Sequence, residues 1–276
     1  MSLQFVTGSS GAGKSQYVYE ELLRESAEHP EKQYLVIVPE QFTMQTQKEI
    51  LQKSPVHGLL NVDILSFNRL AWRVFGETGG DSRPVLEDTG KSLVVQRVVS
   101  AQKKNLKVLG KSLSRQGAVE QMKSLISELM QYRIEPRELS AWTEGSSPYF
   151  SDKIRDVQTV YQGFRDYIRD HYLTTEEVPE LLCGVIGKSS LVRDSVVLLD
   201  GFTGFTPVQN LVVRELLALA EKVTVVVTLD GREDPWQTGG IHQLFYMSKR
   251  MIRDTAKLAE ETHTELLPVR KADSRG

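Results

Sequence analysis

The segment Gly8-Ser9-Ser10-Gly11-Ala12-Gly13-Lys14-Ser15 decides the fold of this chain. It matches the phosphate-binding pattern G-x-x-x-x-G-K-[ST] at every fixed position. The apolar residues 3–7 predict a strand before it, and apolar residues at helical spacing over 14–27 predict a helix after it. Such a loop presents backbone N–H groups to a phosphate at the positive end of a helix. We therefore expect all eight residues to bind a nucleotide.

Lys14 and Ser15 have separate roles in this pattern. The lysine reaches the β- and γ-phosphates, and the serine hydroxyl is a ligand for Mg²⁺. A second metal ligand is expected at the end of another core strand. Asp200 directly follows the apolar run 196–199 and is the natural candidate. The expected ligands are therefore ATP and Mg²⁺, with Ser15 and Asp200 at the metal.

The position after Asp200 argues against efficient hydrolysis. A glutamate there would activate the attacking water, but this chain has Gly201, which has no side chain to act as a general base. Glu215 and Asp230 are possible replacements. Glu215 falls within a predicted helix and Asp230-Gly231 is an ordinary turn dipeptide, so neither is favoured. We expect nucleotide binding with weak or no hydrolysis, and no catalytic residue.

The remaining strand signals predict an α/β fold. A continuous apolar, β-branched run at 34–38, similar strand patterns at 195–199 and 223–228, and a strand signal at 62–66 are typical of a buried parallel sheet. Between 87 and 190 helical periodicity dominates. The predicted fold is a P-loop NTPase (RecA-like) sheet domain, residues 1–86 and 191–276, interrupted by a mainly helical inserted domain, residues 87–190.

Composition limits the classes of function. Lys and Arg total 34 against 36 for Asp and Glu, so any DNA contact must come from a local basic surface. Cys183 is the only cysteine, which excludes a disulfide framework and a cysteine-built cluster within these residues. No apolar run approaches the roughly 18 residues of a membrane span. A reducing cytoplasm is the expected location.

Three segments carry a resemblance to a known family. They are the phosphate loop, the stretch 35–47 with its VIVPEQFTMQTQ centre, and the region Asp200-Gly201-Phe202-Thr203-Gly204-Phe205-Thr206-Pro207-Val208-Gln209. Together they resemble superfamily-one helicases of the UvrD/RecB kind. The intact loop with a degraded second motif is similar to the N-terminal, helicase-like portion of the B subunits of bacterial AddAB (RexAB type) helicase-nucleases. The resemblance covers the whole chain.

The resemblance implies a role in processing DNA ends for recombination. In that family an AddA-like partner subunit supplies the active motor, and the two form a heterodimer. The AddB-type protein surveys single-stranded DNA for the Chi hotspot and carries a nuclease domain with a 4Fe–4S cluster, which would lie in a C-terminal part that is absent here. The resemblance also implies Gln209 as a nucleotide-binding residue. The complex is an ATP-dependent helicase/exodeoxyribonuclease, and activity of this fragment alone stays open.

Loops at the carboxyl ends of parallel strands provide the candidates for DNA contact. Single-stranded DNA is held through its phosphates and by stacking of bases on aromatic rings. The candidates are Phe42, Thr43, Ser66, Phe67, Asn68 and Arg69. Phe42 and Phe67 are equally compatible with core positions at the start of amphipathic helices. Trp72 is expected in the core.

Two other functions fit the same loop. A stand-alone P-loop kinase acting on a small molecule would use the loop in the same way, although no lid-like arginine pair or acceptor site is apparent. A structural scaffold whose loop has lost its nucleotide is the third interpretation.

Overall fold

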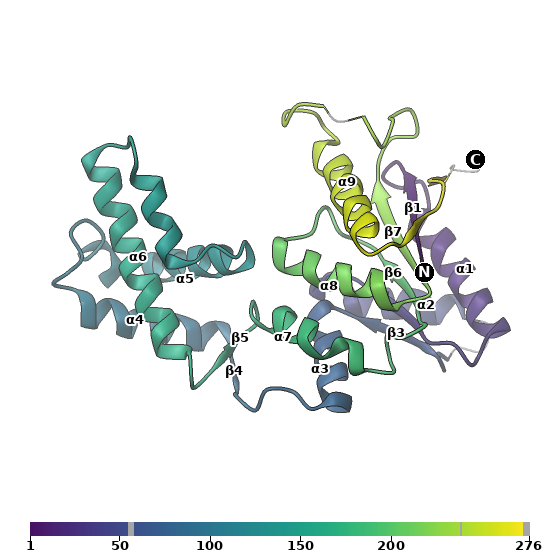
Figure 1. Cartoon of the computed structure of the whole chain (residues 1–276), viewed down its shortest axis with the longest axis horizontal. Helices are drawn as coiled ribbons and strands as arrows, with labels where there is room; N and C mark the ends of the chain where they lie inside the picture. Colours follow the sequence, from purple (N-terminus) through teal and green to yellow (C-terminus); the bar gives the residue numbers. More distant parts are fainter. Residues whose placement is uncertain (55–57, 238, 273–276) are drawn as a thin grey trace. The chain divides into compact units, whose positions relative to one another are not determined.

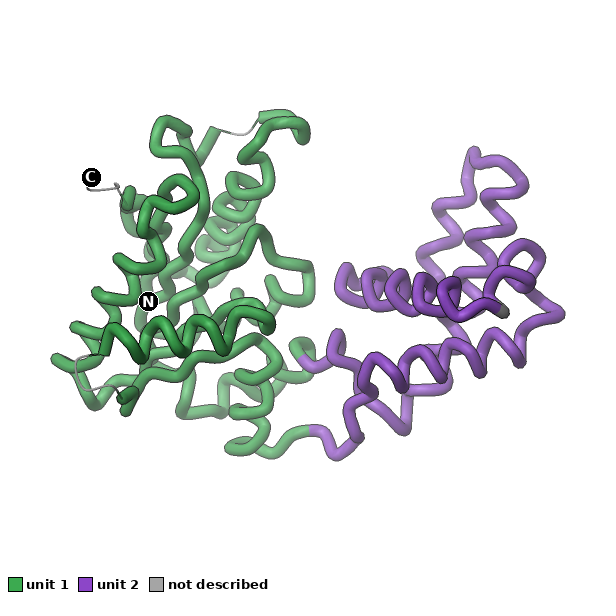
Figure 2. Tube along the Cα trace, turned by 180° about the vertical axis from the view of Figure 1, so that it is seen from behind, with its two compact units in different colours: residues 1–80, 179–276 green, residues 81–178 purple. Residues whose placement is uncertain are grey.

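The computed structural model describes residues 1–54, 58–237 and 239–272 (Figure 1). Residues 273–276, the end of the predicted sheet domain, lie outside this description, as do 55–57 and 238. The chain forms two compact units, Met1–Gly80 with Pro179–Gly276, and Asp81–Val178 (Figure 2). The first unit is therefore built from two separate stretches of sequence. The predicted domains have different bounds, 1–86 with 191–276 for the sheet domain and 87–190 for the helical domain. Their correspondence to the two units stays a prediction.

The first unit contains a parallel sheet, as the apolar runs predict. Its strand order is β3-β2-β6-β7-β1-β8, with β9 also pairing with β1, and every registered pair is parallel. The α/β class with a parallel sheet is confirmed. The strands are β1 Ser2–Gly8, β2 Tyr34–Ile37, β3 Val62–Leu65, β6 Val196–Leu199, β7 Lys222–Thr228, β8 Glu265–Leu266 and β9 Arg270–Lys271.

Helices cover both faces of this sheet (Figure 1). On one face, Val6, Val36 and Leu198 belong to a core cluster with Tyr19 of α1 and Ile50 of α2. Successive strand residues point to opposite faces, so the buried neighbours of these residues line the other face, where α8 and α9 contact β7. Burial on both faces explains why the strands are continuous apolar runs.

Side-chain caps mark the starts of α3 and α8 in the first unit. Ser66 caps α3 by accepting a hydrogen bond of 3.2 Å from Arg69 N. Thr206 caps α8 and precedes Pro207 in the first turn. The helices are α1 Lys14–Glu28, η1 Glu40–Phe42, α2 Thr43–Lys53, α3 Phe67–Thr78, α7 Val178–Val185, η4 Ile186–Lys188, α8 Pro207–Leu219 and α9 Tyr246–Glu261.

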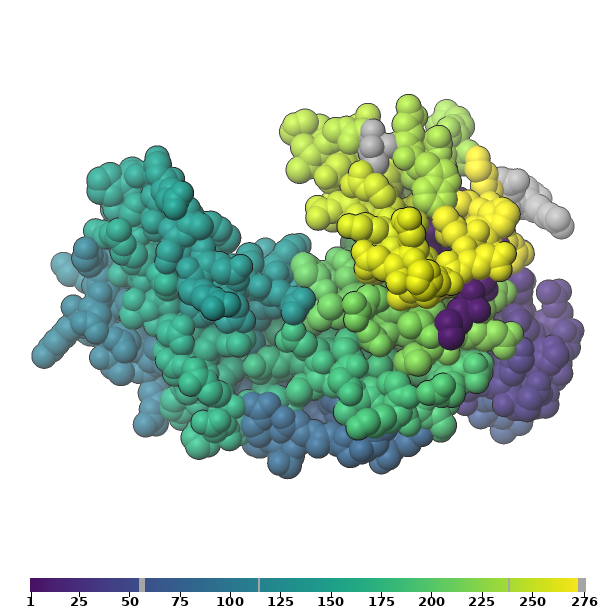
Figure 3. Space-filling view, in the orientation of Figure 1, coloured from purple at the N-terminus to yellow at the C-terminus, as the bar shows by residue number. Residues whose placement is uncertain are grey.

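The edge of the sheet beside β1 is closed by the last described residues. β8 pairs with Ser2 and Leu3, and β9 pairs with Val6 and Thr7. Pro268 lies between the two strands, and its carbonyl accepts a hydrogen bond of 3.2 Å from Gln4 Nε2. In the space-filling view the yellow C-terminal segment lies against the purple N-terminus (Figure 3). The two ends of the first unit are therefore joined through β1.

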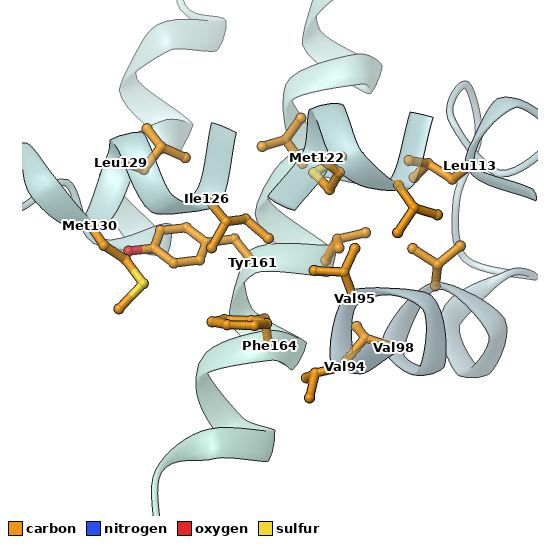
Figure 4. Close-up of a cluster of buried hydrophobic side chains, with 14 of the residues drawn as sticks. Val94, Val95, Val98, Leu113, Met122, Ile126, Leu129, Met130, Tyr161 and Phe164 are labelled. Atoms are coloured by element: carbon orange, nitrogen blue, oxygen red, sulfur yellow. The ribbon is translucent and has the colours of Figure 1, made fainter. Parts of the chain in front are cut away.

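The second unit is mainly helical, as the periodicity over 87–190 predicts. Its elements are β4 Val85–Leu86, α4 Asp88–Gln102, η2 Ser112–Ser114, α5 Gln116–Gln131, η3 Pro136–Thr143, α6 Pro148–Ile168 and β5 Leu173–Thr174. Residues such as Val95, Ile126 and Phe164 form one apolar core between α4, α5 and α6 (Figure 4). In the described part of the chain, no helix is long and apolar enough to cross a membrane.

Asp156 of α6 holds a loop of the second unit. Its buried carboxylate, 2% exposed, accepts hydrogen bonds of 2.9, 2.7 and 2.8 Å from the backbone N–H groups of Lys107, Val108 and Leu109. Unpaired buried N–H groups are costly, so one side chain fixes three consecutive residues. The loop between α4 and η2 therefore depends on this carboxylate.

We expect Asp156→Ala to destabilise the second unit by about 3 kcal/mol, because three partly buried backbone donors lose a charged acceptor. Hydrogen–deuterium exchange should accelerate at the amides of residues 107–109. Asp152→Ala is the matched control on the same helix, since Asp152 forms ion pairs with the exposed side chains of Lys107 and Arg155. Equal exchange in the two variants would contradict the role assigned to Asp156.

Candidate nucleotide site

The predicted site residues emerge at one edge of the sheet. Because all the strands are parallel, their carboxyl ends meet there: β1 ends at Gly8, β6 is followed by Asp200, and β3 is followed by Ser66. β7 lies between β1 and β6, so Asp200 is two strands away from the loop, about 10 Å. The phosphate loop, the candidate metal carboxylate and the candidate DNA residues therefore share this edge.

The loop has the backbone of a phosphate cradle. Gly11 and Gly13 have φ values of 76° and 75°, in the left-handed region that favours glycine, and a Cβ at either would meet no atom within 4 Å. Lys14 opens α1 and is 8% exposed, with its ammonium group donating to the Ser9 carbonyl at 2.7 Å. Burial lowers the pKa of Lys14, while the charge of Asp200 opposes this. A buried ammonium is thus held inside the loop.

Asp200 is held by two donors from the chain. Its Oδ2 accepts a hydrogen bond of 2.7 Å from the Tyr19 hydroxyl, and its Oδ1 accepts one of 2.8 Å from Gly201 N. Asp200 is 6% exposed. Tyr19 was not among the residues predicted from the sequence. The signal available was its position four residues after Ser15, on the same face of α1.

The donor set at this edge fits Mg²⁺. Ser15 offers a hydroxyl and Asp200 a carboxylate, and hard oxygen ligands are those that Mg²⁺ takes, together with phosphate oxygens and water. Within the described residues, no group of three or more His, Cys, Asp or Glu side chains could hold a metal by itself. A metal here would therefore depend on a bound nucleotide for most of its ligands.

Gly201 has a conformation that excludes most side chains. Its φ is 79°, and an added Cβ would lie 3.3 Å from Pro39 Cδ and 3.7 Å from Phe42 Cδ2. An L-residue in the left-handed region costs about 1–2 kcal/mol. The backbone conformation at this position therefore disfavours a glutamate side chain.

The other acidic and amide candidates have partners of their own. The Asp230 carboxylate binds Arg232 through both oxygens, at 3.0 and 3.1 Å, which lowers its pKa to about 2. Glu215 pairs with Arg214 at 3.0 Å. Gln209 completes a capping box: its Oε1 accepts from Thr206 N at 2.9 Å. The amide oxygen of Gln209 is therefore engaged at the start of α8.

The six candidate DNA residues divide by exposure. Thr43, Ser66 and Phe67 are buried, and the two hydroxyls bind Glu40. Phe42 is 43% exposed. Asn68 is half-buried, and Arg69 is exposed with its Nε 3.1 Å from Glu40 Oε1. The side chains open to a ligand in this structure are therefore Phe42, Asn68 and Arg69.

An aromatic cluster links two loops at this edge. Phe67 packs on Phe202 and Phe205, with ring centroids 5.4 and 6.3 Å apart. The burial of Phe67 agrees with a core position. The expectation that Trp72 lies in the core is wrong, because Trp72 is 45% exposed and packs edge-on against Phe75. The cluster fixes the start of α3 against the loop after β6.

Comparison with known proteins places this arrangement in a family. The model of a family described as "ADDB, N-terminal" matches residues 5–275. The chain belongs to the AddB N-terminal family. The phosphate loop, the strand before Asp200 and the helical unit all lie within the matched residues.

Curated relatives agree with the family. A protein named as the B subunit of an ATP-dependent helicase/deoxyribonuclease, from Lachnoclostridium phytofermentans, is 45% identical over 97% of this chain. Proteins of the same name from Geobacillus kaustophilus and Moorella thermoacetica are 34% and 36% identical over 94% and 83% of it. The alignments cover 24%, 23% and 21% of these relatives, so the chain spans about a quarter of their length.

We expect Gly201→Ala to lower the free energy of unfolding by about 1–2 kcal/mol, because alanine must adopt a left-handed φ. Urea denaturation measures this difference. Gly204→Ala is the matched control, since its added Cβ would lie at an ordinary 3.6 Å from Met247 Cε and its φ is outside that region. Similar losses in the two variants would contradict the constraint at Gly201.

Proposed function

We propose that this chain is the N-terminal, helicase-like portion of an AddB-type protein, and that it binds Mg-ATP at Gly8–Ser15 while hydrolysing it weakly or not at all. The observation that carries the proposal is the buried Lys14 ammonium inside a glycine cradle, with Asp200 tied to the same helix through Tyr19. Membership of the AddB N-terminal family supports this proposal over a stand-alone P-loop kinase. The sheet topology is compatible with the RecA-like fold.

Each part of the site has a role in nucleotide binding. The Lys14 ammonium would exchange the Ser9 carbonyl for phosphate oxygens, a stronger charge-assisted partner. The loop's N–H groups and the start of α1 would bind the remaining phosphate charge. Ser15 and Asp200 would hold Mg²⁺, which neutralises charge between the phosphates when bound. These groups bind and orient the nucleotide without supplying a base.

Weak hydrolysis follows from what surrounds Asp200. Gly201 offers no general base, and the carboxylate of Asp230 is committed to Arg232. Phosphoryl transfer to water needs a group that orients the attacking molecule. Neither of these two positions provides such a group. We therefore expect the nucleotide to act through its binding to the site and not through its hydrolysis.

Single-stranded DNA is the second proposed ligand. Phe42 offers an exposed ring for base stacking, and Arg69 and Asn68 offer donors to phosphates at the same edge. The relatives are named as parts of an ATP-dependent helicase/deoxyribonuclease, which supports DNA as the substrate. Arg69 would leave its exposed pair with Glu40 to meet a phosphate, at little cost.

The whole protein would act within a larger enzyme. We propose a heterodimer with an AddA-like motor subunit, which processes DNA double-strand breaks for recombination and responds to Chi-type sequences. The nuclease domain and its 4Fe–4S cluster would belong to the rest of the protein. Burial raises the pKa of the Cys183 thiol to about 12, which makes it a poor cluster ligand here. The cytoplasm is the proposed location.

The nucleotide proposal is tested by titrating the chain with a fluorescent ATP analogue in the presence of Mg²⁺. Lys14→Ala should weaken binding roughly 10- to 100-fold, since it removes a charged donor to the phosphates. Lys257→Ala, an exposed lysine on α9, is the control and should bind normally. Absence of binding by the unmodified chain would favour the structural scaffold. Rapid ATP turnover, with or without single-stranded DNA, would contradict the inactive site.

For DNA, we expect Phe42→Ala to weaken binding of a fluorescent poly-dT oligonucleotide about 10-fold, through loss of base stacking. Arg69→Ala should reduce the dependence of the affinity on salt concentration, because it removes one phosphate contact. Tyr149→Ala, an exposed aromatic residue of the second unit, is the control. Unchanged affinity and salt dependence in both site variants would place the DNA elsewhere.

A further inference from the structure

Tyr19 makes a long-range contact that the phosphate-loop pattern does not require. Its hydroxyl reaches Asp200 Oδ2 at 2.7 Å across 181 positions of sequence. Ser15 lies one helical turn before Tyr19, so both side chains project from one face of α1. Tyr19 therefore ties the helix that opens at the phosphate loop to the strand end that carries the candidate metal carboxylate.

The surroundings of Tyr19 keep its hydroxyl a donor. The side chain is 3% exposed, and its hydroxyl lies 2.7 Å from Asp200 Oδ2. A carboxylate offers only acceptors, so the phenol supplies the proton of this bond. The Tyr19 proton has the Asp200 carboxylate as its partner.

The orientation of Asp200 depends on such partners. The last torsion of an aspartate is broad, so its oxygens are not fixed by rotamer preference. Gly201 N and Tyr19 fix one oxygen each, at 2.8 and 2.7 Å. Partners of this kind orient metal-binding carboxylates, and their loss typically costs 10- to 100-fold in metal affinity.

We propose that Tyr19 is a positioning residue of the nucleotide site: its hydroxyl fixes the plane of the Asp200 carboxylate and so strengthens the binding of Mg²⁺ to the nucleotide-loaded chain. This inference rests on the proposed function, because a nucleotide must supply most of the metal's ligands. Tyr19 acts through Asp200 and touches neither phosphate nor water in this role. Binding of metal-free nucleotide, which depends on Lys14 and the loop backbone, is independent of it.

A second tyrosine separates this role from a structural one. Tyr34 belongs to the same core cluster, is 0% exposed, and donates its hydroxyl proton to the Glu25 carbonyl at 3.0 Å. Tyr19→Phe and Tyr34→Phe each keep the buried ring and remove one hydrogen bond. A purely structural role predicts similar behaviour of the two variants at the nucleotide site. A positioning role predicts a difference confined to Mg²⁺.

The experiment measures binding of a fluorescent ATP analogue to the full chain, first in EDTA and then across a MgCl₂ titration. In EDTA the unmodified chain, Tyr19→Phe and Tyr34→Phe should bind alike. The Mg²⁺ concentration for half-maximal effect should rise roughly 10-fold in Tyr19→Phe and stay unchanged in Tyr34→Phe. Thermal unfolding confirms that both variants are folded. Asp200→Asn should abolish most of the Mg²⁺ effect.

The outcomes distinguish the inference from the proposed function. An unshifted titration in Tyr19→Phe, with the Mg²⁺ effect lost in Asp200→Asn, overturns the role of Tyr19 and leaves the nucleotide site intact. Equal shifts in both tyrosine variants also overturn it, because they indicate a general effect of the core. A full Mg²⁺ effect in Asp200→Asn overturns Asp200 as the metal ligand, and the role of Tyr19 with it. Failure of the unmodified chain to bind contradicts the proposed function itself.

Discussion

Parallel pairing of every strand in the sheet is the constraint on which the rest of the first unit depends. It requires each connection to cross back over a face of the sheet, so helices bury both faces and the strands must be apolar throughout. It also brings the carboxyl ends of distant segments to one edge. Gly8, Ser66 and Asp200 are far apart in the sequence, yet all three lie at this edge. The relative positions of these residues are therefore set by the strands that precede them.

Much of this arrangement could be predicted from local signals. The strand–loop–helix around Gly8–Ser15 and the buried strands each have a pattern of a few residues, and these patterns place the elements correctly in the sequence. The short strands β8 and β9 were missed, because each has two residues and Pro268 interrupts them. The prediction for Trp72 is wrong because helical periodicity locates the buried face of a helix only to within about one residue, and Trp72 lies beside that face.

The contacts that define the site were the part that sequence could not supply. The hydrogen bond between Tyr19 and Asp200 depends on the strand order, in which β7 separates β1 from β6. No short sequence pattern predicts that order. At Gly201 the sequence indicates only that a glutamate is missing, whereas the φ of 79° is a property of the folded turn. Burial of Thr43 and Phe67 likewise depends on packing between α2, α3 and the loop after β6.

Under the proposed function, these features favour retention of a nucleotide. A buried lysine, a carboxylate held by two hydrogen bonds and a glycine in a left-handed conformation would all restrict movement around its phosphates. Hydrolysis instead requires a group free to reorganise around an attacking water. The stability of the Asp200 arrangement and the absence of a base at Gly201 are therefore consequences of one backbone, in which the strand ends and turns directly over Pro39. A glutamate at position 201 would therefore require a change in that turn as well as a new side chain.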